Sequence, residues 1–342
     1  MDKLYFQHLD KAVETDKRFK HVMAIALDPR TDYKEGVVRC ITSREGDVRV
    51  KGYIDRSILS FVKSDSAGHF IIDEELKIKN QEEIITGLSD KDHDFIGLED
   101  PDIWIDEKTD LLHLYFTIPM IGKKINGKKI AKTLIHLGHA VGKDLNSLVM
   151  TDPVLISDKE SLCAKELSIA PVNSKKVRLN LVESATSAGD TGYSIVRVAI
   201  APDMGKSWQF GETVFHPAEH KISWIGGHAS PGPMFPREFI DIGENKLLGI
   251  MNGREADKKI DGRIIYGIFS VGLFIYDYEN GKIDWVSPEP FIRDSESKNI
   301  TFASQFVLTV KGEGILYAHV DDSFVRAYDL KAEEIKKLLD RR

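Results

Sequence analysis

Cysteine is scarce in this chain, with only Cys40 and Cys163 among 342 residues. Two cysteines so far apart provide neither a disulfide framework nor the paired spacing of a zinc site. A run of about 20 apolar residues, the length of a transmembrane helix, is also absent. The charged opening MDKLYFQHLDKAVETDKRFK has no apolar signal core. We therefore expect a cytoplasmic protein with reduced thiols.

Basic residues are fewer than acidic ones, 47 against 54, which gives a formal net charge of −7. Nucleic acids and acidic membrane surfaces bind basic faces, so we expect neither as a partner. A hydrophobic content of 42% is ample for a core. The length fits one large β domain or two ordinary ones.

Helical periodicity is confined to the two ends of the chain. Residues 3–20 carry Leu4, Leu9, Val13 and further apolar residues at helical spacing, and residues 331–342 (KAEEIKKLLDRR) are typical of a terminal helix. The sequence predicts a helical extension over 1–22 and a second helix at the C-terminus. We expect the first helix to cover a face of the domain or to meet a second copy of the chain in a homo-oligomer.

Between the two ends, short runs rich in Val, Ile, Tyr and Phe alternate with Gly, Asp, Asn and Lys turns. This is the signature of strands, and it recurs at residues 36–43, 56–64, 111–119, 130–142, 177–185, 194–202, 246–253, 263–278, 300–310, 314–322 and 323–330.

Four similar turns punctuate these strands, at residues 64–70, 142–148, 202–208 and 278–285. A fifth strand, ending at residues 327–330, stands where another such turn would begin. Five weak repeats of one four-stranded unit predict an all-β fold, a five-bladed β-propeller that forms a single domain over 23–342. A β-sandwich with long loops is the alternative.

Carboxylates stand at the ends of several apolar runs. Asp100 precedes Pro101 in GLEDPDIWID, Glu183 ends VRLNLVESA, and further acids are Asp28 and Asp322. A propeller brings the inner ends of its strands to one central funnel, where two carboxyl groups can perform glycoside hydrolysis. Each of these acids could instead cap a turn.

Five stretches in order resemble glycoside hydrolase family 130, whose five-bladed propellers cleave or phosphorolyse β-mannosides. The resemblance covers residues 25–340. GLEDPDIWID is similar to the family's Glu-Asp-Pro-Arg strand, whose Asp is the general acid. The other four stretches are AKELSIAPVNSKKVRLNLVES, GGHASPGPMFPREFIDIGENKLLGIMNG, FSVGLFIYDYENGKIDWVSPEPFI and NITFASQFVLTVKGEGILYAHVDDSFVRAYDL.

Several positions depart from that family. Asp102 stands in place of an arginine, Asn252 in place of a phosphate-contacting histidine, Phe269 and Ser270 in place of Tyr-Arg, and Glu183 where an arginine is expected. Phosphate sites depend on arginine for bidentate, charge-assisted hydrogen bonds. The departures therefore predict a hydrolase rather than a phosphorylase.

The resemblance implies that Asp100 is the general acid, acting through a proton relay in the sugar. A carboxylate in the emptied phosphate position could deprotonate water, so we predict Glu183 as the general base of an inverting hydrolase. Burial near Trp104 and Glu99 should raise the pKa of Asp100 and keep it protonated.

Further residues are predicted to bind the carbohydrate substrate. The resemblance implies this for Arg39, Arg44, Lys165 and Asp322, and position in the chain suggests it for Glu99, Asp102, His228, Asn252 and Arg254. A histidine without clustered partners is poor evidence for a metal, so we expect neither a metal nor a cofactor. The expectation of mannose comes from the resemblance alone.

Two other functions are compatible with the sequence. A phosphorylase could rebuild its anion site from Lys165, Arg254 and Arg263. A carbohydrate-binding propeller that has lost catalysis would not need Asp100 and Glu183 to face each other within about 10 Å, the separation that an inverting pair requires.

Overall fold

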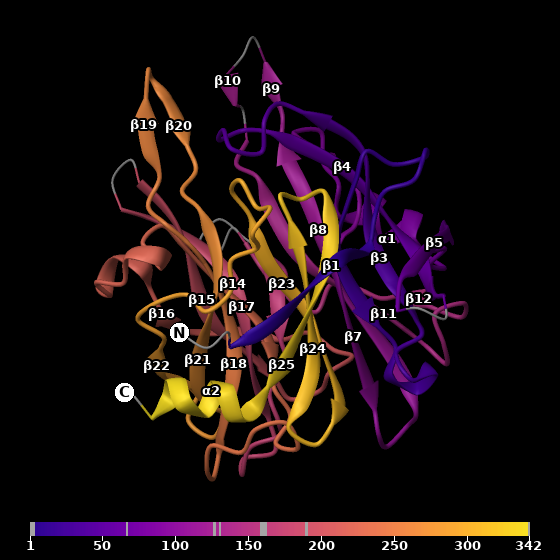
Figure 1. Cartoon of the computed structure of the whole chain (residues 1–342). Helices are drawn as coiled ribbons and strands as arrows, with labels where there is room; N and C mark the ends of the chain where they lie inside the picture. The colour runs from indigo at the N-terminus through magenta and orange to yellow at the C-terminus, as the bar shows by residue number, and fades with distance from the viewer. Residues whose placement is uncertain are drawn as a thin grey trace.

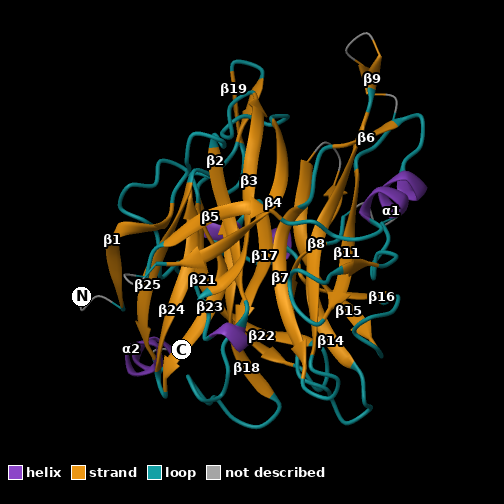
Figure 2. Ribbon diagram, turned by 90° about the vertical axis from the view of Figure 1, so that its right-hand side faces the viewer, coloured by secondary structure: helices purple, strands orange, loops and turns teal. Residues whose placement is uncertain are grey.

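Strands make up most of the computed structural model, which describes residues 4–65, 68–125, 128–129, 131–157, 163–188 and 191–340. Its α-helices in those ranges are α1 (Gln81–Leu88) and α2 (Ala332–Leu339). Both lie at the periphery of the strands (Figures 1 and 2). Three short 3-10 turns are η1 (Pro29–Thr31), η2 (Pro217–Glu219) and η3 (Ser223–Ile225). Within the described part of the chain, no helix has the length and apolar character to cross a membrane.

The first half of the chain forms two antiparallel sheets. One has the strand order β2 (His21–Leu27), β3 (Glu35–Glu45), β4 (Ile54–Ser64) and β5 (Phe70–Glu75). The other contains β6 (His93–Phe95), β7 (Glu99–Asp106), β8 (Leu111–Gly122), β11 (Leu134–Gly142) and β12 (Val149–Met150).

Two further groups of four strands follow, joined by one parallel pair between Ser194 and His228. The first group is β13 (Lys165–Ser168), β14 (Arg178–Ala188), β15 (Thr191–Ala201) and β16 (Gln209–Phe215). The second is β17 (His228–Met234), β18 (Lys246–Arg254), β21 (Phe269–Asp277) and β22 (Lys282–Val286). Two hairpins, β9 (Lys124–Ile125) with β10 (Lys128–Lys129) and β19 (Lys258–Ile260) with β20 (Arg263–Ile265), project from one end of the molecule (Figure 1).

The last sheet unites the two ends of the chain. Its strand order is β1 (Tyr5–Val13), β25 (Phe324–Lys331), β24 (Glu313–Val320) and β23 (Thr301–Val310). The C-terminal helix is confirmed, with Ile335 and Leu339 buried on α2.

The predicted helix over 1–22 is wrong, because β1 is a strand that pairs antiparallel with β25. The apolar residues that suggested a helical stripe do not share one buried face: Leu9 is 84% exposed and Val13 only 1%. The free edge of β25 offers backbone partners, and Tyr5 packs edge-on against Tyr328. Tertiary pairing thus overrides local periodicity.

Packed layers between the sheets form the core. Successive residues of the central strands are buried on both faces, including Leu114, Tyr115 and Phe116 of β8 and Ile250 and Met251 of β18. Continuous burial of this kind is typical of strands that are covered on both sides.

One strand from each of the five groups, namely β2, β7, β13, β17 and β23, shares two features with the others. β2 contacts β7, β7 contacts β13, β13 contacts β17, β17 contacts β23, and β23 contacts β2, so the contacts form a ring. Each strand also has a register irregularity with its antiparallel neighbour, and these fall at residues 23–25, 99–102, 165–167, 231–234 and 303–305. A bulge re-aims side chains locally, so these five positions decide what faces the middle of the ring.

Candidate functional site

The five bulges enclose a small cavity of about 60 Å³. Among its lining residues, Ala24 comes from β2, Asp100 from β7, Glu166 from β13, Gly232 from β17 and Ser304 from β23. A water molecule occupies about 30 Å³ in the liquid. The cavity therefore has room for water but not for a sugar ring.

A second cavity of about 770 Å³ is large enough for a sugar. Glu183, Lys165, His228 and Arg254 contribute to its polar wall, together with Lys51 and Lys132. Tyr53, Tyr266 and Phe269 supply aromatic surface. Residues 131–133, which follow β10, and Tyr266, which follows β20, also line it, so this cavity lies near the end from which the two hairpins project (Figure 1).

Arg39 of β3 holds two neighbouring carboxyl groups. Its Nη2 lies 2.6 Å from Glu99 Oε1, and its Nη1 lies 2.9 Å from Asp100 Oδ1. Burial raises the pKa of Asp100, but Arg39 and Lys165 outweigh it, and the net shift is downward. The expectation of a raised pKa for Asp100 is therefore wrong. Burial raises the pKa of Glu99 to about 7 despite Arg39, and the charge of Asp100 adds to that rise.

Glu183 of β14 lies between two nitrogen groups at the wall of the larger cavity. His228 Nε2 is 3.0 Å from its Oε2, and Lys165 Nζ is 3.7 Å from its Oε1. Burial raises the pKa of Glu183, but His228 and Lys165 lower it more, to about 2. Burial lowers the pKa of His228, and Glu183 opposes that shift only in part. At neutral pH the site thus holds an ionised Glu183 beside a neutral imidazole.

Lys165 connects the two cavities electrostatically. It lines the larger one, and the charges of Glu183, Glu166 and Asp100 raise its pKa well above the ordinary value although burial lowers it. Lys165 also helps to lower the pKa of Asp100, which lines the smaller cavity. The two predicted catalytic carboxyl groups therefore face a common lysine.

Glu166 is a site residue that the sequence analysis missed. Glu166 and Asp100 line the same small cavity, and burial followed by the charge of Asp100, with a hydrogen bond to its side chain, raises the pKa of Glu166 well above the ordinary value. The only signal in the sequence is its place beside Lys165 at the start of a strand, in a repeat position equivalent to that of Asp100.

Asp102 and Asn252, both predicted to bind sugar, lie in surroundings unlike those of a sugar ligand. Asp102 lines the small cavity, has no ion pair within the described ranges, and burial raises its pKa to about 7. Asn252 is fully buried, and its amide exchanges two hydrogen bonds with the backbone of Ala303, at 3.0 and 2.8 Å. Both of its polar groups are therefore engaged in joining β18 to β23.

The remaining predicted residues lie around these cavities. Arg44 makes a fork with Asp55, with Nε and Nη2 at 2.7 and 2.6 Å from the two carboxylate oxygens. Asp322, at the end of β24, lies 3.2 Å from His319 Nε2. Arg254 pairs with Asp257, and its guanidinium lies 4.3 Å from the ring centre of Tyr266. Arg254 lines the larger cavity, whereas Arg44 and Asp322 do not.

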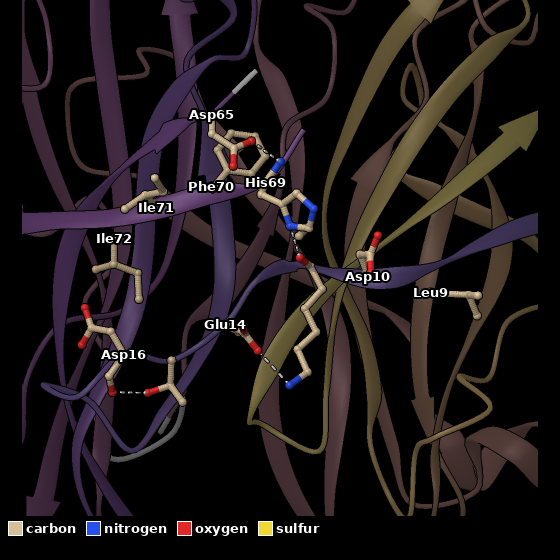
Figure 3. A pocket seen from close by; sticks show the side chains of 12 residues that line it. Leu9, Asp10, Glu14, Asp16, Asp65, His69, Phe70, Ile71 and Ile72 are labelled. Atoms are coloured by element: carbon tan, nitrogen blue, oxygen red, sulfur yellow. Dashed lines mark hydrogen bonds and ion pairs between the residues drawn. The ribbon is translucent and has the colours of Figure 1, made fainter. Parts of the chain in front are cut away.

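A third hollow of about 530 Å³ lies beside β1 and β5 (Figure 3). His69 Nδ1 lies 2.8 Å from the Lys11 carbonyl oxygen, and Lys11 Nζ lies 2.9 Å from Glu14 Oε2. Its polar groups thus satisfy one another, which makes it a weaker candidate than the larger cavity. Among the residues that the structure describes, no group of three or more His, Cys, Asp or Glu side chains is arranged to hold a metal.

No protein-family model matches the sequence, and no curated protein matches it either. Solved structures do match. The β-1,2-mannobiose phosphorylase from Listeria innocua is 14% identical, with a TM-score of 0.67 and coverage of 100% of both chains. A glycosidase-like protein from Bacteroides thetaiotaomicron is 16% identical, with a TM-score of 0.63 and coverage of 96% of each chain.

More distant enzymes are also similar. The mannose phosphorylase MPT-4 from Leishmania mexicana has 11% identity and a TM-score of 0.53, over 97% of this chain and 91% of the other. Identities this low establish a likeness of fold. The chain thus has the mostly-β fold of glycoside hydrolases and phosphorylases.

Proposed function

We propose that this protein is an inverting glycoside hydrolase that acts on β-linked, mannose-containing oligosaccharides or glycosides. The observation that carries the proposal is Glu183, an ionised carboxylate held between Lys165 and His228 at the wall of a sugar-sized cavity. The fold shared with mannoside phosphorylases and glycosidases supports the substrate class.

A five-bladed propeller is the architecture we infer for this enzyme. Its support is the ring of contacts among β2, β7, β13, β17 and β23, each of which belongs to a different group of antiparallel strands. In such an arrangement β1 supplies the outer strand of the last blade, so the first and last parts of the chain close the ring together.

The reaction requires one proton to reach the glycosidic oxygen and one to leave water. We assign the first to Asp100, in the group of carboxyls around Arg39. We assign the second to Glu183 with His228, because an ionised carboxylate can orient water and a neutral imidazole can accept a proton. Water then attacks the anomeric carbon on the face opposite the leaving group, and the configuration inverts.

Phosphorolysis is the second candidate, and the cations of the larger cavity favour it. Lys51, Lys132, Lys165 and Arg254 all line that cavity. Glu183 argues against it, because a carboxylate with a pKa of about 2 repels a phosphate beside Lys165. Arg263, at the start of β20, is not among the lining residues within the described ranges.

Sugar release from a panel of β-mannosides, aryl glycosides and oligosaccharides, with and without phosphate, tests this function. The wild type is compared with Asp100→Asn and Glu183→Gln, and the exposed Asp110→Asn and Glu219→Gln serve as matched controls. Phosphate-independent release that both site variants lose supports the hydrolase. Release only with phosphate identifies a phosphorylase. Sugar binding without release identifies a binding propeller.

A further inference from the structure

Asp100 cannot be understood as an isolated acid. Its carboxyl group faces Arg39 on one side and the carboxyl group of Glu166 on another. We propose that Asp100 and Glu166 form a pair that shares one proton, and that this pair is the proton donor of the reaction. The inference rests on the proposed function and adds Glu166 as a positioning residue that acts through Asp100.

The backbone places these two groups together in a way that the other bulges do not repeat. Asp100 and Glu166 lie at the bulges of β7 and β13, two strands in contact, and both have left-handed backbones with φ of 46° and 52°. The equivalent places on the remaining strands include Ala24, Gly232 and Ser304, which carry no charge. Ala24 also has a left-handed backbone, with φ of 47°, so this conformation belongs to the bulge, and the two neighbouring carboxyl groups are what distinguishes β7 and β13.

The carboxyl groups in this region outnumber the permanent cations by two, which favours protons on Glu99, whose pKa is raised to about 7, and on the Asp100–Glu166 pair. Four buried or nearly buried carboxyl groups, those of Glu99, Asp100, Glu166 and Glu183, face two permanent cations, Arg39 and Lys165. Glu99 and Asp100 share Arg39, and Glu183 takes Lys165. Glu166 has no ion pair within 4 Å in the described ranges. Burying an unpaired carboxylate is expensive, so the group retains a proton instead.

Other titratable groups act on the pair from the strands around it. Lys165 and Arg39 stabilise the ionised form of Asp100, as does His319 of β24. Glu183 raises the pKa of Glu166, and Asp102 lines the same small cavity. Glu99 and Asp55 are the remaining acids near the pair: Glu99 contacts Arg39, Asp55 contacts Arg44, and the charges of both act on Arg39. The positive groups act mainly on Asp100, so the proton resides mostly on Glu166, which donates a hydrogen bond to Asp100.

The chemical step then balances. As the bond between the anomeric carbon and the glycosidic oxygen breaks, the pair releases its single proton toward that oxygen and becomes doubly ionised. Water supplies hydroxide to the anomeric carbon and its proton to the Glu183–His228 side. Before the next turnover the Glu183–His228 side releases that proton to solvent and the Asp100–Glu166 pair takes one up, so the enzyme ends unchanged.

Glu166→Gln tests the pair, because glutamine keeps the shape and can donate to Asp100 but has no exchangeable acid proton. Asp100 alone then ionises at low pH. We expect kcat/KM at neutral pH to fall by about 10²–10⁴-fold. The decline in rate at rising pH should begin at least about two pH units lower than in wild type, which corresponds to a hundredfold lower proton affinity. Glu219→Gln, the same substitution at an exposed position, is the matched control and should keep the wild-type profile.

A substrate with a strongly acidic leaving group separates proton donation from structural damage. Such a leaving group departs without protonation, so Glu166→Gln should retain most of its activity on an activated aryl glycoside while it loses activity on an oligosaccharide. Equal loss on both substrates with an unchanged pH profile would overturn the proposal. So would wild-type behaviour of the variant on both.

A spectroscopic measurement keeps the inference testable if no glycoside is turned over. The infrared difference spectrum of wild type minus Glu166→Gln at neutral pH should contain the carbonyl band of a protonated carboxyl group. The corresponding spectrum for the exposed Glu219→Gln should lack it. A protein without glycosidase activity that shows this band would refute the proposed function and leave the shared proton standing. Absence of the band would refute the shared proton itself.

Discussion

His228 Nε2 lies 3.0 Å from Glu183 Oε2, so the first residue of β17 is tied to β14 at the wall of the larger cavity. Lys165 approaches the other oxygen of the same carboxylate. This arrangement keeps Glu183 ionised and fixes the orientation of the imidazole. For this reason we propose that Glu183 and His228 activate the water molecule.

Glu183→Gln should therefore reduce turnover more than substrate binding. Glutamine can still accept a hydrogen bond from His228, but it no longer supplies a negative charge to Lys165 or to the developing positive charge on the imidazole. We expect kcat to fall by about 10²–10⁴-fold, while KM changes much less. Steady-state kinetics beside the exposed Glu219→Gln measure both. A variant that raised KM at unchanged kcat would indicate that Glu183 only binds substrate.

The sequence alone predicts the strand-rich fold and the C-terminal helix, because both depend on the local spacing of apolar residues. The assignment of Asp100 and Glu183 comes from carboxylates at strand ends together with the family resemblance, and it stays a prediction. The same reasoning fails for Glu166, because its partner Asp100 lies on another strand and only the bulges bring the two carboxyl groups together.

Long-range contacts decide two other features. Asn252 is predicted as a sugar ligand, and the structure gives its amide a partner in the backbone of Ala303, 51 residues away. The first strand looks helical because its apolar spacing is ambiguous, and the free edge of β25 decides the outcome. Local sequence patterns thus predict most element types, but they do not reveal long-range hydrogen bonds or which sheet edges are free to pair.

Asn252→Ala should destabilise the fold without weakening sugar binding in the protein that remains folded. The substitution leaves the N–H and the C=O of buried Ala303 without partners, at a cost of about 1–3 kcal/mol for each group. Denaturant unfolding and sugar titration measure the two effects, with exposed Asn146→Ala as the control. Lost sugar affinity at unchanged stability would restore Asn252 as a ligand.

Val13→Asp should unfold the last sheet, whereas Leu9→Asp on the same strand should be tolerated. Val13 is 1% exposed and Leu9 is 84% exposed, and an unpaired charge in a buried position costs about 3–5 kcal/mol. Thermal unfolding of the two variants tests the pairing of β1 with β25 directly. Similar midpoints for both would mean that the N-terminal segment contributes little to the domain.

Asp102 should make the protein less stable as the pH rises toward neutrality. Its pKa is raised by burial from 3.8 to about 7. Between these values the folded state binds the proton and the unfolded state does not, so the free energy of unfolding falls with increasing pH. The span of about three pH units corresponds to an upper limit of about 4 kcal/mol.

Asp102→Asn removes that dependence, because asparagine has nearly the same shape and cannot ionise. Its free energy of unfolding should equal that of wild type near about pH 4 and exceed it by up to about 4 kcal/mol above about pH 7. Exposed Asp110→Asn should follow the wild-type curve throughout. Denaturant titrations at a series of pH values give the difference curve. If that curve were flat, Asp102 would already be ionised in the folded protein, and a cation or solvent would have to reach it in the small cavity.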